Sequence, residues 1–517
     1  MKSAYEGLVL NLRSVALLCV FPVAASAQVT LPKVLSDHMV VQRDLPVHMW
    51  GLAQAGEQVS VTFRGETKSA AANQLGRWSV YLKPGVAGGP FEMTVSGTPV
   101  ATASDAASSK PAAAQTVTIH DVLVGDVWVA SGQSNMEFPL ERASTAAADL
   151  PKADNQKIRL LIVDKKAADF PQDDVPTTGW AASSPEAAKA FSAVAWYFAR
   201  EIEQREHVPV GVIDSTWGGT PAEAWTRLTA LGQDAQVNSL FAVRGQMVDQ
   251  GTDSALAVKE EQRQREEAKA EGKPAPQFPW HPALESYGPG YLWNAMIAPL
   301  TPFPIRGAIW YQGEANAGAE RFPYYDRVMR DMIEDWRREW GVGAFPFYYV
   351  QLANWITGPD SNWADVRNQQ VRTLGERNTA MAVTIDVGNP NDIHPTDKAT
   401  VGHRLALAAR ALHYGERDLE YSGPMFRQAT AEGSSIRAWF DHAKGLTAKG
   451  SGVTSVEVAG ADGKYFPATA SVEGETMVAS SPEVPNPVAI RYGWASNPQC
   501  NLYNADGLPA SPFTSER

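Results

Sequence analysis

The sequence has little cysteine and no excess of basic side chains. Only Cys19 and Cys500 occur in 517 residues, which excludes a disulfide framework and a metal site built from several thiolates. Acidic side chains outnumber basic ones by 57 to 45, so the formal charge is −12 and a nucleic-acid partner is not expected. With 44% hydrophobic and 20% charged residues, the composition is that of a soluble globular protein, and it includes 16 tryptophans.

The sequence also lacks a membrane-spanning run near its start, where it carries the three parts of a secretory signal peptide. Lys2 and Arg13 precede an apolar run at 15–23, which is followed by Ala25-Ser26-Ala27. The run is shorter than the roughly 20 residues that a transmembrane helix needs. We therefore expect a signal peptide at residues 1–27, cleaved after Ala27, and an exported protein, periplasmic or secreted, with no membrane anchor.

The hydrophobic pattern divides the mature chain into three parts. Residues 28–116 show short alternating segments broken by turns, as in a small β-sandwich-like domain. Residues 117–415 alternate strand-like and helix-like segments, which indicates an α/β domain with a doubly wound, mostly parallel sheet. Residues 416–517 return to the strand pattern, so a C-terminal β-rich domain is expected.

Six strands and three long helices are predicted within the α/β part. The strands are expected at 126–130, 158–163, 210–214, 307–311, 347–352 and 381–386. The helices are expected at 186–205, 324–340 and 396–414. A highly charged run at 258–273 is interpreted as a solvated surface helix. Strands of the flanking domains are predicted at 47–51, 58–63, 77–82, 435–440, 454–458, 477–479 and 488–492.

Reactive side chains follow four of the predicted strands of the α/β part. In a doubly wound sheet ligands bind at the carboxyl ends of the strands, so these side chains are expected to meet. They are a serine (Ser134), a glycine turn (Gly218-Gly219), two amides (Gln312 and Asn316) and the pair Asp392 and His394. A serine nucleophile needs an imidazole base, a carboxylate that orients the base, and donors for the oxyanion. The combination predicts acyl transfer through a serine.

Four blocks of sequence carry a resemblance to a known family. They are Gly125–Glu137 with Gly132-Gln133-Ser134-Asn135-Met136 inside it, Trp217–Pro221, Trp310–Ala317 and Asp392–Pro395. Together they resemble the sialate O-acetylesterase family within the SGNH hydrolase superfamily, and the similarity extends from Asp37–Gln42 to Asn501–Asn504. The resemblance implies an SGNH-type α/β sheet and an esterase that requires no metal or organic cofactor.

The resemblance also implies roles for individual residues. Ser134 would be the nucleophile and His394 the general base. The N–H groups of Ser134 and Gly219, with an amide from Gln312 or Asn316, would form the oxyanion hole. Asp392 is the expected acid of the triad; Asp386 is an alternative, and so is a Ser-His dyad supported by a carbonyl.

An exported carbohydrate O-acetylesterase is the resulting hypothesis, with an acetylated carbohydrate as its partner. Trp217, Trp355 and Trp363 lie near strand ends, where an aromatic face can stack on a sugar ring. Recognition of O-acetylated sialic acid would instead favour an arginine on the sugar carboxylate, for which Arg367 or Arg321 is available. The aromatic content favours acetylated plant polysaccharide, of xyloglucan or xylan type, over sialic acid.

Two other classes compete with this hypothesis. One is a glycan-binding module on an inactive hydrolase core, which the survival of all the expected catalytic residues disfavours. The other is a metallohydrolase that uses Asp386, Asp392, His394 and His403, whose spacing matches no recognised ligand pattern.

Overall fold

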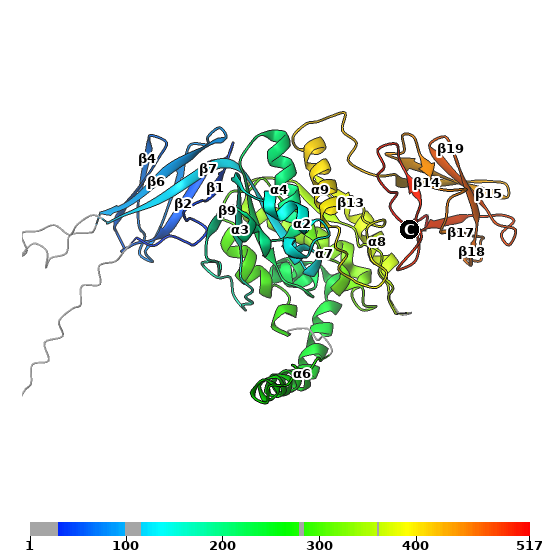
Figure 1. The fold of residues 1–517 in the computed structure, drawn as a ribbon, viewed down its shortest axis with the longest axis horizontal. Helices are drawn as coiled ribbons and strands as arrows, with labels where there is room; N and C mark the ends of the chain where they lie inside the picture. The colour runs from blue at the N-terminus through cyan, green and yellow to red at the C-terminus, as the bar shows by residue number, and fades with distance from the viewer. Residues whose placement is uncertain (1–28, 99–114, 279–283, 359–360, 517) are drawn as a thin grey trace, which may run out of the picture.

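The computed structural model describes residues 29–98, 115–278, 284–358 and 361–516, with the backbone alone for 247–256 and 284. The predicted signal peptide, residues 1–27, lies outside these residues. N-terminal strands, a central α/β part and C-terminal strands follow one another along the long axis of the molecule (Figure 1). Within the described ranges, every helix is too short or too polar to cross a bilayer.

The N-terminal part is built from short strands whose side chains alternate between buried and more exposed positions. The alternation is regular in β3 (Gln58–Phe63) and β5 (Arg77–Leu82), as the apolar pattern predicts. β3 pairs with β4 (Glu66–Ala71) and β6 (Gly88–Thr98), while β5 pairs with β2 (Val47–Leu52).

One long strand, β7 (Gln115–Gly132), belongs to both the N-terminal and the central part. Up to Gly125 it pairs with β6 and β1 (Val40–Gln42). From Asp126 onward it pairs with β10 (Val210–Thr216) and β11 (Gly307–Tyr311). The boundary expected between residues 116 and 117 thus falls at the start of a continuous strand, and the change of partners comes about nine residues later. The alternation of apolar and polar residues along a strand does not reveal where the strands that pair with it change.

The central sheet has the strand order β13-β12-β11-β7-β10-β8-β9. Neighbouring strands are parallel except β8 and β9, which are antiparallel, so the sheet is mixed. The six predicted strands are all present, and β9 is an edge strand that the pattern does not predict. The bounds of the other strands are β8 Asn155–Ile162, β9 Trp180–Ser183, β12 Phe347–Val350 and β13 Thr379–Ala382.

Helices cover both faces of this sheet. Val127 and Val129 of β7 share a buried cluster with α7 (Tyr325–Trp340), while Trp128 and Ala130 pack with α4 (Ala193–Glu206) and α9 (Lys398–Leu412). The single helix expected at 186–205 is two helices, because Ser192 caps α4 by accepting the Ala195 N–H. The remaining helices are α1 Ser134–Glu137, α2 Ala146–Asp149, α3 Pro185–Lys189, α5 Leu228–Gln233, α6 Ser239–Ala270 and α8 Trp363–Thr373.

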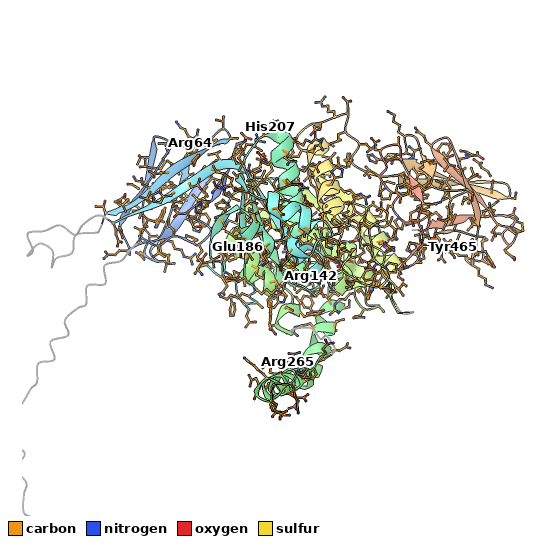
Figure 2. All side chains as sticks on the ribbon, viewed as in Figure 1. Arg64, Arg142, Glu186, His207, Arg265 and Tyr465 are labelled. Atoms are coloured by element: carbon orange, nitrogen blue, oxygen red, sulfur yellow. The ribbon has the colours of Figure 1, made fainter. Side chains whose placement is uncertain are left out.

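One helix projects from the α/β part. α6 contains most of the predicted charged run and projects from the body; Figure 2 shows Arg265 on this projection.

The C-terminal part contains two four-stranded antiparallel sheets and one strand pair, packed around a buried cluster of their own that includes Val458 and Ile490. Its strands are β14 Met425–Glu432, β15 Ser435–Asp441, β16 Thr447–Ala448, β17 Val456–Ala459, β18 Tyr465–Pro467, β19 Thr469–Glu473, β20 Thr476–Ser480, β21 Ala489–Tyr492, β22 Leu502–Tyr503 and β23 Phe513–Thr514.

Candidate active site

Ser134 and His394 meet at the carboxyl edge of the central sheet. Ser134 is the first residue of α1, immediately after β7, and His394 lies in the loop between β13 and α9. The Ser134 Oγ is 2.8 Å from the His394 Nε2, which is hydrogen-bond distance. The two side chains are 260 residues apart in sequence, and the parallel sheet brings them together.

A cavity of about 810 Å³ opens over this pair. It is formed by the turns that follow β7, β10 and β11 and by the histidine loop, as expected for a parallel sheet. Its lining residues are Gln133, Ser134, Glu137, Phe138, Pro139, Arg142, Lys165, Trp217, Gly218, Gly219, Tyr287, Glu314, Ala315, Ile393 and His394.

Asp392 is the carboxylate that lies beside the His394 ring. Its Oδ1 accepts the backbone N–H of His394 at 2.8 Å and is 3.5 Å from the His394 Nδ1. The second distance is longer than an ordinary hydrogen bond, and the Asp392 side chain is 49% exposed. Asp392 therefore holds the histidine loop through the backbone and acts on the ring mainly through its charge.

The alternative acid, Asp386, is engaged elsewhere. Both of its oxygens accept hydrogen bonds from Arg404, at 2.6 and 2.8 Å. His403, a proposed ligand in the metallohydrolase alternative, is paired with Glu201 at 2.7 Å. Among the described residues no group of three or more histidine, cysteine or carboxylate side chains is arranged to hold a metal ion.

The surroundings of His394 favour its neutral form. Burial lowers the pKa of the imidazole, and the positive charges of Lys398 and Arg142 lower it further. The nearby Asp392 carboxylate opposes this effect. The ring is therefore available as a proton acceptor at a lower pH than an unperturbed histidine.

The glycine turn after β10 lies against Ser134. A Cβ on Gly218 would lie 3.2 Å from the Ser134 Cβ and 3.1 Å from Glu137 Oε2, so any larger residue would press on the serine turn. The Gly218 N–H donates to Glu137 Oε2 at 2.6 Å, and Glu137 Oε1 is paired with Lys165. Gly219 lines the cavity beside Ser134, as the expected oxyanion donors require.

The two candidate amide donors, Gln312 and Asn316, do not line the cavity, which corrects the expectation for both. The Gln312 amide donates to the Thr220 carbonyl and to Asn316 Oδ1, at 3.1 and 2.7 Å. The Asn316 amide donates to Glu223 Oε2 at 2.9 Å. Both side chains are buried, and they fix the chain that follows the glycine turn.

Of the four predicted substrate-binding residues, Trp217 alone lines the cavity. Arg367 is fully buried and donates to four backbone carbonyls, two of them at Ala495 and Ser496 of the C-terminal part. This burial lowers the pKa of its guanidinium to about 9. Trp363 is buried with its indole N–H on the Ala353 carbonyl, and Trp355 packs edge-on against it. Arg367 therefore holds the α/β part against the C-terminal part, and the two tryptophans pack within the α/β part.

Arg321, the other arginine considered for a sugar carboxylate, is also buried, and it pairs with Glu223 at 3.0 Å. The cations at the cavity are instead Arg142 and Lys165, which sequence reasoning missed. The Arg142 guanidinium lies over the Phe138 ring, 5.0 Å from its centre. It has no ion-pair partner among the described residues, and Figure 2 labels it on the central α/β part. The sequence signal that could have pointed to Arg142 is its place shortly after the Gly125–Glu137 block that contains Ser134.

Comparisons with known proteins agree with the chemistry of this site. The model of the family "Carbohydrate esterase, sialic acid-specific acetylesterase" matches residues 280–411. The sialate O-acetylesterase of Rattus norvegicus is 30% identical over 525 residues, covering 93% of each chain, and that of Homo sapiens is 29% identical, covering 93% of this chain and 91% of the human protein. The crystal structure of a carbohydrate acetylesterase from Xanthomonas citri is 37% identical with a TM-score of 0.79, covering 94% of this chain and 99% of that one.

These similarities define the class of the protein, an ester hydrolase that removes acetyl groups from carbohydrate. The chain belongs to the sialate O-acetylesterase family. The resemblance expected from the four sequence blocks is therefore confirmed. Because the relatives are esterases, the alternative of a glycan-binding module on an inactive hydrolase core is not retained.

Proposed function

We propose that Ser134 attacks the acetyl carbonyl of an O-acetylated sugar while His394 Nε2 takes the hydroxyl proton. The bond between the carbonyl carbon and the sugar oxygen breaks, and His394 returns the proton to that oxygen. Water then attacks the acetyl-enzyme, His394 takes its proton, and acetate leaves as Ser134 is reprotonated. The observation that carries this proposal is the 2.8 Å contact between Ser134 and His394 inside the cavity.

The N–H groups of Ser134 and Gly219 are the proposed oxyanion donors, and Asp392 is the proposed acid. Ser134 begins α1, so its N–H has no partner within the helix. Gly219 borders the same space. We also propose the SGNH type for the central domain at 117–415, flanked by a β-sandwich-like domain at 28–116 and a β-rich domain at 416–517. The mechanism requires no metal or organic cofactor.

Replacement of Ser134 by alanine tests the nucleophile. We expect hydrolysis of 4-nitrophenyl acetate to fall by about three orders of magnitude or more, because the remaining groups only stabilise the oxyanion. Ser131→Ala is the matched control, since it removes a buried hydroxyl three residues earlier in β7. Retained turnover in Ser134→Ala would reject this mechanism.

The substrate we propose is an acetylated plant polysaccharide of xyloglucan or xylan type. The cavity offers Phe138, Trp217 and Tyr287, and aromatic faces suit neutral sugar rings. O-acetylated sialic acid is the second candidate, which the names of the mammalian relatives and the unpaired Arg142 favour.

Acetate release from acetylated xyloglucan, acetylated xylan and O-acetylsialic acid, measured in parallel, separates the two substrates. A neutral polysaccharide predicts release from the first two and little change in Arg142→Gln. A sialate esterase predicts release from the third and a rise in KM in Arg142→Gln, because the sugar carboxylate loses its partner.

Export is proposed from residues 1–27 alone. N-terminal sequencing of the protein recovered from the periplasm or the medium tests it, with Gln28 as the expected first residue. An intact N-terminus in the cytoplasm would contradict export.

A further inference from the structure

A buried lysine next to the serine turn occupies a position that is unfavourable for a positive charge. Lys398 is the first residue of α9 and is fully buried. Burial lowers the pKa of its ammonium to about 7, and the positive end of the helix dipole also disfavours a cation there. A residue that costs stability in this way calls for a functional reason.

The contacts of Lys398 lead directly to the catalytic pair. Its Nζ donates to Asn135 Oδ1 at 2.5 Å, and Asn135 follows Ser134 in the chain. The Asn135 amide nitrogen donates to the Ile393 carbonyl at 2.9 Å, and Ile393 precedes His394. One side chain therefore connects the turn that carries the nucleophile to the loop that carries the base.

The orientation of the Asn135 amide is fixed from both ends. Its oxygen faces the Lys398 ammonium, and its nitrogen also donates to Glu314 Oε1 at 2.6 Å. A flipped amide would place NH₂ against the ammonium and oxygen against the carboxylate. The Lys398 ammonium also lies over the Phe138 and Tyr311 rings, 4.8 and 5.3 Å from their centres, which stabilises the cation in place.

We propose that Lys398 is a positioning residue: through Asn135 it aligns Ser134 with His394. Held against the residue that connects the serine turn to the histidine loop, its ammonium also supplies a positive charge that disfavours protonation of the His394 imidazole. The proposal rests on the assignment of Ser134 and His394 made above. Arg142, which lines the cavity, acts on His394 in the same direction as Lys398, and Asp392, in the same loop, opposes both. Glu314, Asp392 and Asp397 face Lys398 itself and favour its charged form.

Lys398→Met in the full chain tests both parts of the proposal, because methionine keeps similar length without charge or donor. We expect the acid limb of kcat/KM for 4-nitrophenyl acetate to move to higher pH by about half a unit or more, since a repulsive charge on His394 is lost. We also expect the plateau of kcat to fall about tenfold or more as the alignment loosens. The midpoint of thermal unfolding is measured alongside, because Asn135 Oδ1 and the buried Glu314 lose their cation and a loss of stability has to be separated from a loss of alignment.

A matched control and a second variant complete the experiment. Lys444→Met removes the same charge from an exposed position in the C-terminal part and is expected to leave the profile unchanged. Asn135→Leu keeps the Lys398 charge and cuts the connection, so its kcat should fall about tenfold with little change in KM. If Lys398→Met does not fold, an unchanged kcat in Asn135→Leu overturns the alignment.

The outcomes separate this inference from the proposed mechanism. A superimposable pH profile and kcat in folded Lys398→Met overturn the inference, and so does a uniform loss of activity with a lowered unfolding temperature and an unmoved acid limb. Retained turnover in Ser134→Ala overturns the mechanism itself, whatever Lys398→Met does.

Discussion

At the scale of single residues, the strength of a triad depends on how closely its acid binds the imidazole. In a buried Ser-His-Asp triad, loss of the acid costs about 10⁴ in kcat. Here the Asp392 oxygen is 3.5 Å from Nδ1, and nearly half of its side chain is exposed, so water screens the interaction. In the proposed mechanism His394 is therefore expected to work largely as the partner of Ser134, with Asp392 in a supporting role.

Asp392→Asn is accordingly expected to lower kcat/KM by only about tenfold. Its acid limb should move to lower pH, because the charge that raises the His394 pKa is gone; this is opposite to the shift expected for Lys398→Met. The pH profile of kcat/KM measures both effects.

Asp386→Asn is the control for this prediction. Asp386 is paired with Arg404 on α9, so its loss should lower stability and leave the acid limb in place. A loss in Asp392→Asn as large as that in Ser134→Ala would instead show a fully coupled triad.

At the scale of elements, the position of Ser134, the proposed nucleophile, depends on the backbone at the end of β7. Gly132 has φ +130°, and a Cβ there would lie 2.2 Å from the Tyr311 carbonyl oxygen of β11. Neither backbone can yield, because both strands sit inside the central sheet. The position two residues before Ser134 therefore accepts only glycine.

Gly132→Ala is expected to destabilise the protein by about 3 kcal/mol and to reduce kcat about 100-fold, because the nucleophile turn is displaced. Gly341→Ala is the control: Gly341 also has positive φ, at +64°, but no atom lies within 4 Å of the place that a Cβ would take, so a cost of about 1 kcal/mol is expected with normal kcat. Denaturant unfolding and steady-state kinetics provide both values. Equal effects of the two substitutions would contradict the steric argument.

The elements also show how far the sequence predicts such a site. Apolar periodicity places the strands of the central sheet other than β9 to within a few residues, and the strand-end rule brings Ser134 and His394 to one edge. That rule cannot distinguish a side chain that faces the cavity from one directed into the protein. Gln312, directly after β11, is buried, and so is Arg367 within α8; each is satisfied by partners distant in sequence.

The buried polar groups below the site were harder to predict for a related reason. Lys398 and Glu314 both hydrogen-bond to Asn135, and the three residues come from three separate segments of the chain. In the sequence each of these residues alone resembles an ordinary surface charge. The pairing of such groups is decided by tertiary packing, which no local pattern contains.

At the scale of the whole molecule, one buried carboxylate joins the N-terminal strands to the catalytic part. Asp126 lies in β7 where the strand changes sheets, and its side chain is fully buried. It accepts hydrogen bonds from Arg43 after β1, from Arg306 before β11 and from the Tyr414 hydroxyl after α9, all at 2.8–2.9 Å. The segments that carry Arg43, Arg306 and Tyr414 are thus held together by one carboxylate.

Asp126→Asn is expected to lower the free energy of unfolding by about 3–5 kcal/mol at pH 7, because Arg43 and Arg306 lose their buried partner. The two arginines hold the Asp126 pKa below its ordinary value despite burial, so the stabilisation is present above the unfolded-state pKa of about 4 and is lost as the pH falls through the lower folded-state pKa. The difference between wild type and variant should therefore shrink below pH 4. Hydrogen exchange should locate the loosening in β1 and the middle of β7.

Asp44→Asn is the matched control for Asp126→Asn. Asp44 pairs with the same two arginines, at 3.8 and 3.1 Å, but its side chain is 63% exposed. An exposed ion pair contributes at most about 1 kcal/mol, so this variant should unfold nearly as the wild type does at every pH. If both variants change stability equally, burial of Asp126 is not what connects the two parts; if only Asp126→Asn exchanges faster in β1, the N-terminal strands depend on this carboxylate for their attachment to the esterase domain.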